Sequence, residues 1–284
     1  MAVSGDDSRA RIGESSLMPE QPNQVARQST TARIAPEETT MATVGRVALV
    51  TGGTGGIGAQ IVSRLARDGY WVAIHYAGQP ARAEEAAAAI RAAGGRAIAV
   101  GGDIADEVRM AALFDEVAAE FSGIDVVINT AGIMLLSPLA ELDLADLDRM
   151  HRVNIRGTFV VSQLAARTLR RGGALINFST SVTRLQFPNY SAYAASKGAV
   201  EAMTLVLARE LRGRDITVNA VAPGPTATPL FLAGKSDDEI AALAHVAPLE
   251  RIGTPDDIAE AVAFLAGPAR WINGQTIFTN GGAA

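Results

Sequence analysis

Residues 51–58 read Thr-Gly-Gly-Thr-Gly-Gly-Ile-Gly and follow directly on the apolar run at 47–50. Gly53, Gly55 and Gly58 have the spacing G-x-G-x-x-G, which indicates a dinucleotide-binding turn when a strand precedes it and a helix follows. Glycine permits a tight turn and lets backbone N–H groups approach a pyrophosphate at the positive end of the helix dipole. The spacing alone is weak, because glycine-rich turns also occur as plain loops, so its meaning depends on the elements that follow.

Downstream of this turn, short apolar runs alternate with amphipathic stretches. Strands are expected at 47–50, 71–76, 97–100, 126–129, 174–178, 216–221 and 275–278. Helices are expected at about 57–68, 81–93, 106–121, 143–170, 191–213 and 255–266. The apolar runs are continuous rather than alternating, as in strands that are buried on both faces. This order predicts an α/β protein whose single domain is a doubly wound parallel sheet (a Rossmann fold), with its ligand beyond the carboxyl ends of the strands.

Composition excludes several classes of protein. The chain has 284 residues, of which 48% are hydrophobic, and a net charge of −5, which argues against nucleic acid or an anionic membrane as a partner. It has no cysteine, and His75, His151 and His245 show no ligand spacing, so no metal site is expected. No apolar run reaches the roughly 18 residues of a membrane span and no secretory signal is visible, so we expect a cytoplasmic protein.

Residues 1–44 differ from the rest of the chain. They are rich in Ser, Thr, Pro, Gln and Glu and have no helical or strand periodicity. Such a composition buries too little apolar surface to offset the entropy of ordering. We therefore expect a disordered N-terminal tail at 1–44 and a folded domain at 45–284. A regulatory arm, or a start site misplaced ahead of Met41, are the alternatives.

Further motifs make residues 46–282 resemble the short-chain dehydrogenase/reductase family. The turn also fits T-G-x-x-x-G-x-G through Gly52, Gly56 and Gly58, and other motifs follow in the family's order. They are Asp103-Ile104, Asn129-Thr-Ala-Gly132, Asn154, Tyr193-Ala-Ala-Ser-Lys197 and Pro223-Gly224. The resemblance implies an NAD(P)-binding oxidoreductase domain that reduces a ketone to a secondary alcohol by hydride transfer. Within the family the chain is most similar to the 3-oxoacyl-acyl-carrier-protein reductase-like branch, which suggests a 3-oxoacyl thioester as one candidate substrate.

The same resemblance implies the cofactor contacts. Asp103 would hydrogen-bond the adenine beside Ile104, while Asn129, Ala131 and Gly132 would pass under the adenine ribose. The family usually has a second Asn where this chain has Thr130, a departure expected to affect local packing. The remaining contacts are the turn residues Gly52, Thr54, Gly55, Gly56, Ile57 and Gly58, and the nicotinamide frame Pro223, Gly224, Thr226 and Thr228.

The end of the second expected strand bears on the choice of nicotinamide. NAD-binding domains place a carboxylate there to accept the ribose hydroxyls. This chain reads His75-Tyr76-Ala77-Gly78 instead, so a 2′-phosphate would meet no like charge and NADP(H) is favoured, with NAD(H) left open. Tyr76 is expected to contact the cofactor, and Arg82 and the Thr54 hydroxyl are the candidates for the phosphate.

Tyr193 and Lys197 are the expected catalytic pair. Four residues apart on a helix, they share one face. A free tyrosine has a pKa of about 10, and a lysine ammonium roughly 5 Å away would lower that pKa by about two units, which suits a proton donor to a carbonyl oxygen. Taken alone, such a pair also occurs on exposed helices. By the resemblance, Lys197 also holds the nicotinamide ribose and Asn154 anchors a water that relays protons.

The hydroxyl partner of Tyr193 is ambiguous. The family's catalytic serine precedes the tyrosine by about 13 residues, a spacing that selects Thr180, whose hydroxyl can still donate to the substrate oxygen. Ser181 is the alternative if the following loop is one residue shorter.

The substrate is expected to be a small carbonyl compound or alcohol, and the resemblance implies that the apolar segment at about 225–248 covers it. The same resemblance implies that helices at 143–170 and 191–213 pair across subunits, which predicts a homotetramer. The competing hypothesis is a sensor that binds NADP(H) and lacks catalysis, which we expect to have lost Tyr193 or Lys197.

Overall fold

The computed structural model describes residues 45–284, so the expected tail at 1–44 lies outside the described residues. Seven strands form one parallel sheet in the order β3-β2-β1-β4-β5-β6-β7. They are β1 (Val47–Thr51), β2 (Trp71–Tyr76), β3 (Ala97–Gly101), β4 (Ile124–Asn129), β5 (Leu169–Phe178), β6 (Thr217–Pro223) and β7 (Thr276–Thr279). The strand order reverses between β1 and β4. The predicted doubly wound parallel sheet is confirmed, and its switch point lies where β1 and β4 end.

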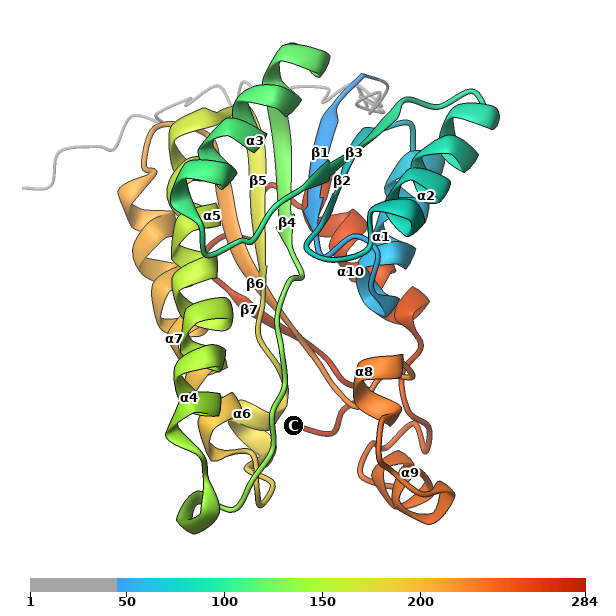
Figure 1. Ribbon diagram of the computed structural model, residues 1–284, viewed down its shortest axis with the longest axis vertical. Coiled ribbons are helices and arrows are strands. Elements are labelled where there is room, and N and C mark those ends of the chain that lie inside the picture. Colours follow the sequence, from blue (N-terminus) through green and yellow to red (C-terminus); the bar gives the residue numbers. More distant parts are fainter. Residues whose placement is uncertain (1–44) are drawn as a thin grey trace, which may run out of the picture. The chain divides into compact units, whose positions relative to one another are not determined.

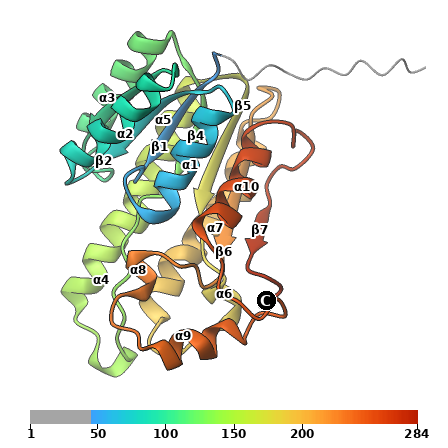
Figure 2. The same ribbon diagram turned by 90° about the vertical axis from the view of Figure 1, so that its right-hand side faces the viewer.

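Helices cover both faces of this sheet (Figures 1 and 2). They are α1 (Gly56–Arg67), α2 (Pro80–Ala92), α3 (Glu107–Phe121), α4 (Leu144–Met150), α5 (Gly157–Thr168), α6 (Val182–Leu185), α7 (Ser191–Glu210), α8 (Pro229–Leu232), α9 (Asp237–Ala244) and α10 (Pro255–Ala266). One apolar core lies between the sheet and α1, α2 and α10, and a second lies between the sheet and α3, α5 and α7. Every residue of β1 is buried, which explains the continuous apolar character of its sequence. No helix within residues 45–284 is long and apolar enough to cross a membrane.

The prediction of one long helix at 143–170 is wrong in two respects. The helix is interrupted by a π-helical turn, His151–Arg156, between α4 and α5, and it ends at Thr168. Strand β5 then begins at Leu169, five residues earlier than expected. Arg170 can occupy this strand because its guanidinium forms an ion pair with Asp125 of β4, which apolar periodicity cannot reveal.

The segment after β6 reaches the carboxyl edge of the sheet. Helices α8 and α9 lie beyond the strand ends, at the lower end of the view in Figure 1. Thr226 and Gly253 form an isolated bridge that ties the two ends of this segment together. Its helices therefore lie over the edge where a ligand of a doubly wound sheet is expected.

Candidate active site

The glycine turn between β1 and α1 is built from close backbone contacts. Gly52 has a φ of +65°, a conformation that favours glycine, and its carbonyl oxygen accepts the Gly55 N–H at 3.0 Å. A Cβ on Gly58 would overlap that same carbonyl oxygen, so no larger residue fits there without moving the turn. A Cβ on Gly56 would lie 2.9 Å from Cγ2 of Thr228, so this glycine lets the turn contact the base of the α8 segment. Such a cradle of exposed backbone at a helix N-terminus could hold a pyrophosphate.

His75 supports this turn, a role that our sequence analysis missed. The imidazole is 1% exposed, its Nδ1 accepts the Gly52 N–H at 3.2 Å, and its Nε2 lies 2.9 Å from the carbonyl oxygen of Gly102. This pattern suits the neutral tautomer with hydrogen on Nε2. Burial lowers the pKa of His75 to about 4, so the ring is neutral at physiological pH. The place of His75 at the end of β2, opposite the turn, is the signal that could have identified it.

A groove of about 650 Å³ runs along the switch point. Most of the expected cofactor residues line it, namely Gly52, Thr54, Gly55, Gly56, Ile57, Asp103, Ile104, Ala131, Gly132 and Thr228. Asp103 also accepts the Ala105 N–H at 2.9 Å and pairs with Arg152 at 2.6 Å. The structure therefore brings residues that follow β1, β3 and β4 together with the α8 segment in one groove.

Four expected cofactor residues, Gly58, Tyr76, Arg82 and Asn129, are absent from the groove lining and from the cavity beside it; Gly58 packs against the Gly52 backbone. The Tyr76 ring packs over Gly101, where a Cβ would lie 2.7 Å from the tyrosine Cζ. Arg82 is exposed on α2, 3.5 Å from the side-chain oxygen of Gln79. Asn129 is buried at the end of β4, where its side chain accepts a hydrogen bond from the Thr51 hydroxyl at 2.6 Å. Its contacts shape the strand ends rather than the groove wall.

Thr130, the departure from the family pattern, has a structural role. Its hydroxyl donates to the Thr51 carbonyl oxygen at 2.6 Å, and it lies against the Gly52 and Gly58 backbone. The hydroxyl thus joins the end of β4 to the glycine turn, in agreement with an effect on local packing.

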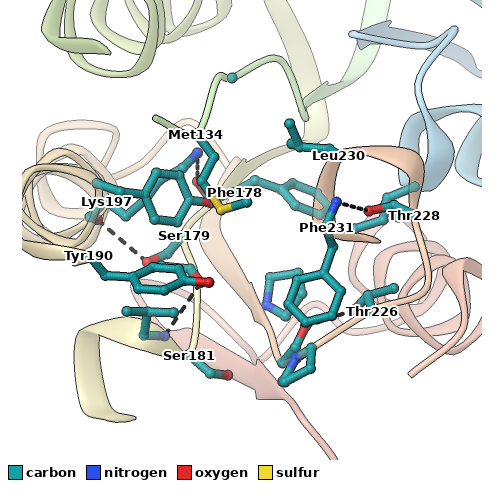
Figure 3. Close-up of a pocket in the computed structure, with 18 of the residues that line it drawn as sticks. Met134, Phe178, Ser179, Ser181, Tyr190, Lys197, Thr226, Thr228, Leu230 and Phe231 are labelled. Carbon is teal, nitrogen blue, oxygen red and sulfur yellow. Dashed lines mark hydrogen bonds between the residues drawn. The ribbon is translucent and has the colours of Figure 1, made fainter. Parts of the chain in front are cut away.

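A second cavity adjoins the groove and shares Ile57, Thr130 and Gly132 with it. Figure 3 shows Lys197, Tyr190 and Met134 on one side of this cavity and Thr228, Leu230 and Phe231 on the other. Tyr193, Thr180 and Ser181 also line it, together with Pro223, Gly224 and Thr226. The expected catalytic residues and the expected nicotinamide frame therefore meet in one space.

Tyr193 and Lys197 lie together on α7, but burial dominates their pKa values. The Lys197 Nζ lies 6.0 Å from the Tyr193 ring centre and donates to the Phe178 carbonyl oxygen at 2.9 Å. Burial raises the pKa of Tyr193 to about 12, with a hydrogen bond to Thr180 partly offsetting it. Burial also lowers the pKa of Lys197 to about 8. The expected lowering of the tyrosine pKa is therefore wrong for this arrangement, because desolvation of the phenol is the largest influence on its pKa.

The two candidate hydroxyl partners point in different directions. Thr180 lies close enough to the Tyr193 phenol to lower its pKa. The Ser181 hydroxyl donates to the Ala222 carbonyl oxygen at 3.2 Å and its N–H donates to the Pro223 carbonyl oxygen at 2.8 Å. This geometry favours Thr180 as the hydroxyl beside the reacting group, and it gives Ser181 a role in joining β5 to β6.

Asn154 lies in the π-helical turn and is completely buried. Its side-chain amide makes two hydrogen bonds with the Ile133 backbone, accepting its N–H and donating to its carbonyl oxygen, each at 2.9 Å. A Cβ on Gly132 would lie 3.2 Å from Asn154 Oδ1 and 3.3 Å from Lys197 Nζ. Asn154 therefore holds the loop after β4 against the lysine. Its expected role in a proton relay stays a prediction.

Glu201, which our sequence analysis missed, lies one turn after Lys197. Its Oε1 accepts the Ser179 hydroxyl at 2.5 Å and the Thr183 hydroxyl at 2.8 Å. These two residues flank Thr180 and Ser181 on the chain. The carboxylate thus holds the end of β5 against α7, and only the tertiary structure brings these residues together.

This arrangement suits an oxidoreductase that takes a dinucleotide in the groove and a small substrate in the cavity. The family model described as Enoyl-(Acyl carrier protein) reductase matches residues 52–284. A short-chain type dehydrogenase/reductase of Picea abies is 43% identical over 249 residues, which cover 84% of this chain and 92% of that protein. The chain belongs to the short-chain dehydrogenase/reductase family.

Two further relatives bear on the cofactor. The NADPH-dependent aldehyde reductase 2, chloroplastic, of Arabidopsis thaliana is 41% identical and covers 84% of this chain and 93% of that protein. The crystal structure of a short-chain dehydrogenase from Burkholderia cenocepacia in complex with NADP has a TM-score of 0.80 and 42% identity, covering 85% of this chain and 99% of that one.

Proposed function

We propose that the protein is an NADP(H)-dependent reductase that converts a ketone or aldehyde to an alcohol, with Tyr193 as the proton donor. The observation that carries the proposal is the meeting of Tyr193, Thr180 and Lys197 in a cavity that adjoins the groove of the glycine turn. When bound, NADPH supplies the hydride that adds to the carbonyl carbon.

The residues present fit a dinucleotide. Gly52, Gly55 and Gly56 would hold the pyrophosphate, because their backbone forms a cradle that side chains would fill. The end of β2 has no carboxylate, so a 2′-phosphate would meet no like charge there. The similarity to proteins described as NADPH-dependent or bound to NADP supports the same preference.

Tyr193 is in the protonation state that a proton donor in reduction requires. Because burial raises its pKa to about 12, the phenol stays protonated at neutral pH and can donate to a carbonyl oxygen as the hydride arrives. Thr180 orients that phenol and can donate to the same oxygen. Lys197 supplies positive charge nearby while its ammonium is anchored on Phe178.

NADPH consumption with a panel of diketones, aldehydes and acetoacetyl thioesters tests the proposal. Tyr193→Phe should abolish turnover and leave NADPH binding intact. Thr180→Val should lower kcat at least tenfold, and Ser181→Ala should change it less than threefold. NADPH binding without turnover of any substrate, unaffected by Tyr193→Phe, would refute it.

We also propose a homotetramer. Phe159 on α5 and Leu205 and Val206 on α7 are between 41% and 55% exposed, so within residues 45–284 these helix faces are uncovered. Pairing of such helices between subunits would bury them. Sedimentation of a monomer at micromolar concentration would refute this assembly.

A further inference from the structure

The segment between α6 and α7 places two aromatic rings beside the catalytic tyrosine. Phe187, Pro188, Asn189 and Tyr190 form a β-turn in which the Tyr190 N–H lies 3.4 Å from the Phe187 carbonyl oxygen. Asn189 has a φ of +72°, and Pro followed by Asn is the sequence signature of a type II turn. The first and last residues of this turn are the two aromatic ones.

These rings continue to the catalytic residue in an edge-to-face series. The Phe187 and Tyr190 ring centres are 6.0 Å apart at 64°, and those of Tyr190 and Tyr193 are 6.3 Å apart at 67°. Both distances and angles are those that aromatic pairs prefer. The backbone carbonyl oxygen of Asn189 accepts the Ser137 N–H at 3.2 Å. This hydrogen bond joins the turn that carries Phe187 and Tyr190 to the loop after β4.

The rest of the cavity is uncharged. Among the described residues that line it, Lys197 alone carries a charge, and its ammonium donates to the Phe178 carbonyl oxygen. Met134 lies on the same side as Tyr190, and Leu230 and Phe231 lie opposite (Figure 3). A substrate with a charge of its own would lose hydration among these uncharged side chains, which is costly.

We propose that the substrate is an uncharged aryl aldehyde or aryl ketone whose ring packs against the wall formed by Phe187 and Tyr190. The inference rests on the proposed function, because it needs the carbonyl carbon to lie at Tyr193. The ring next to that carbon then extends the edge-to-face series outward. The wall is positioned in advance by the turn, so little conformational entropy is lost when the ring binds.

The test compares substrates matched in size. kcat/KM for NADPH-dependent reduction is measured with benzaldehyde and cyclohexanecarbaldehyde, and with methyl 4-formylbenzoate and 4-formylbenzoate. The aryl aldehyde should exceed its saturated counterpart roughly threefold to tenfold, the range of one aromatic contact. The carboxylate should fall at least tenfold below its methyl ester.

Variants of one residue separate the ring from the hydroxyl. The aryl preference is the ratio of kcat/KM for benzaldehyde to kcat/KM for cyclohexanecarbaldehyde. Tyr190→Phe should keep this ratio, whereas Tyr190→Leu should reduce it toward one. Trp271→Leu, at a fully exposed aromatic residue outside the cavity, is the matched control and should keep the ratio. Each ratio is measured within one enzyme, so a partial loss of folded protein does not affect it.

Three results would overturn the inference while the proposed function stands: equal reduction of the aryl and saturated aldehydes, an unchanged ratio in Tyr190→Leu, or equal reduction of the carboxylate and its ester. If no carbonyl compound is reduced although NADPH binds, the proposed function fails and the inference with it.

Discussion

The neutral, buried His75 should make the stability of the folded protein depend on pH. In the unfolded chain a histidine has a pKa of about 6.5, whereas in the folded protein burial lowers the pKa of His75 to about 4. Between these values the unfolded state binds a proton that the folded state does not, so the free energy of unfolding falls as pH falls from about 6.5 to about 4. The full difference of roughly 2.5 pKa units corresponds to about 3 kcal/mol.

A smaller pH range is practical, because the pI of about 5.3 favours precipitation at lower pH. Between pH 7.5 and pH 6.0 the same linkage gives a loss of about 0.8 kcal/mol from His75 alone. Urea unfolding at both pH values, for the wild type and for His75→Gln, isolates this term, since the amide can replace both hydrogen bonds but does not titrate. Equal pH dependence in the two proteins, at one protein concentration, would refute the reasoning.

Three further predictions concern the site. Gly58→Ala should lower the free energy of unfolding by about 2 kcal/mol or more and weaken NADPH binding at least tenfold, because its Cβ overlaps the Gly52 carbonyl oxygen. Urea unfolding and fluorescence titration measure the two effects, and Gly78→Ala, whose Cβ meets nothing within 4 Å, should change the free energy of unfolding by less than about 0.5 kcal/mol. Reduction should slow above about pH 8, where Lys197 loses its ammonium, and a pH–rate profile of Lys197→Arg should lack this decline; an identical decline in both enzymes would contradict the assignment. Glu201→Ala should lower kcat about threefold to tenfold, because it removes the hydrogen bonds to Ser179 and Thr183, and Glu201→Gln should have a kcat nearer that of the wild type. Equal kcat in Glu201→Ala and the wild type would show that these hydrogen bonds do not position Thr180.

Local patterns were sufficient to predict the seven strands and the residues of the glycine turn. The turn is visible because backbone contacts such as that of Gly58 with Gly52 exclude any side chain, and so determine residue identity. The start of β5 was not visible, because Arg170 depends on an ion pair with a distant strand. The π-helical turn around Asn154 was also missed, since its stability comes from hydrogen bonds to Ile133 rather than from periodicity.

In the site, too, local spacing could be predicted from the sequence and contacts between distant residues could not. The spacing of Tyr193 and Lys197 predicts that they share a helix face, and the structure has them so. The pKa of Tyr193 could not be predicted from that spacing, because the result depends on how much water surrounds both groups. His75 and Glu201 act on backbone and hydroxyl groups far along the chain, and no local motif marks such contacts.

The opposite shifts of Tyr193 and Lys197 have a chemical consequence. Burial raises the pKa of the phenol to about 12 and lowers the pKa of the ammonium to about 8, so the neutral phenol is the stable form at neutral pH. In the proposed reduction, once Tyr193 has given its proton to the substrate oxygen, the resulting phenolate is a much stronger base than the neutral lysine. Return of a proton from the ammonium side is therefore downhill, and the proton donor is restored without any acid stronger than Lys197.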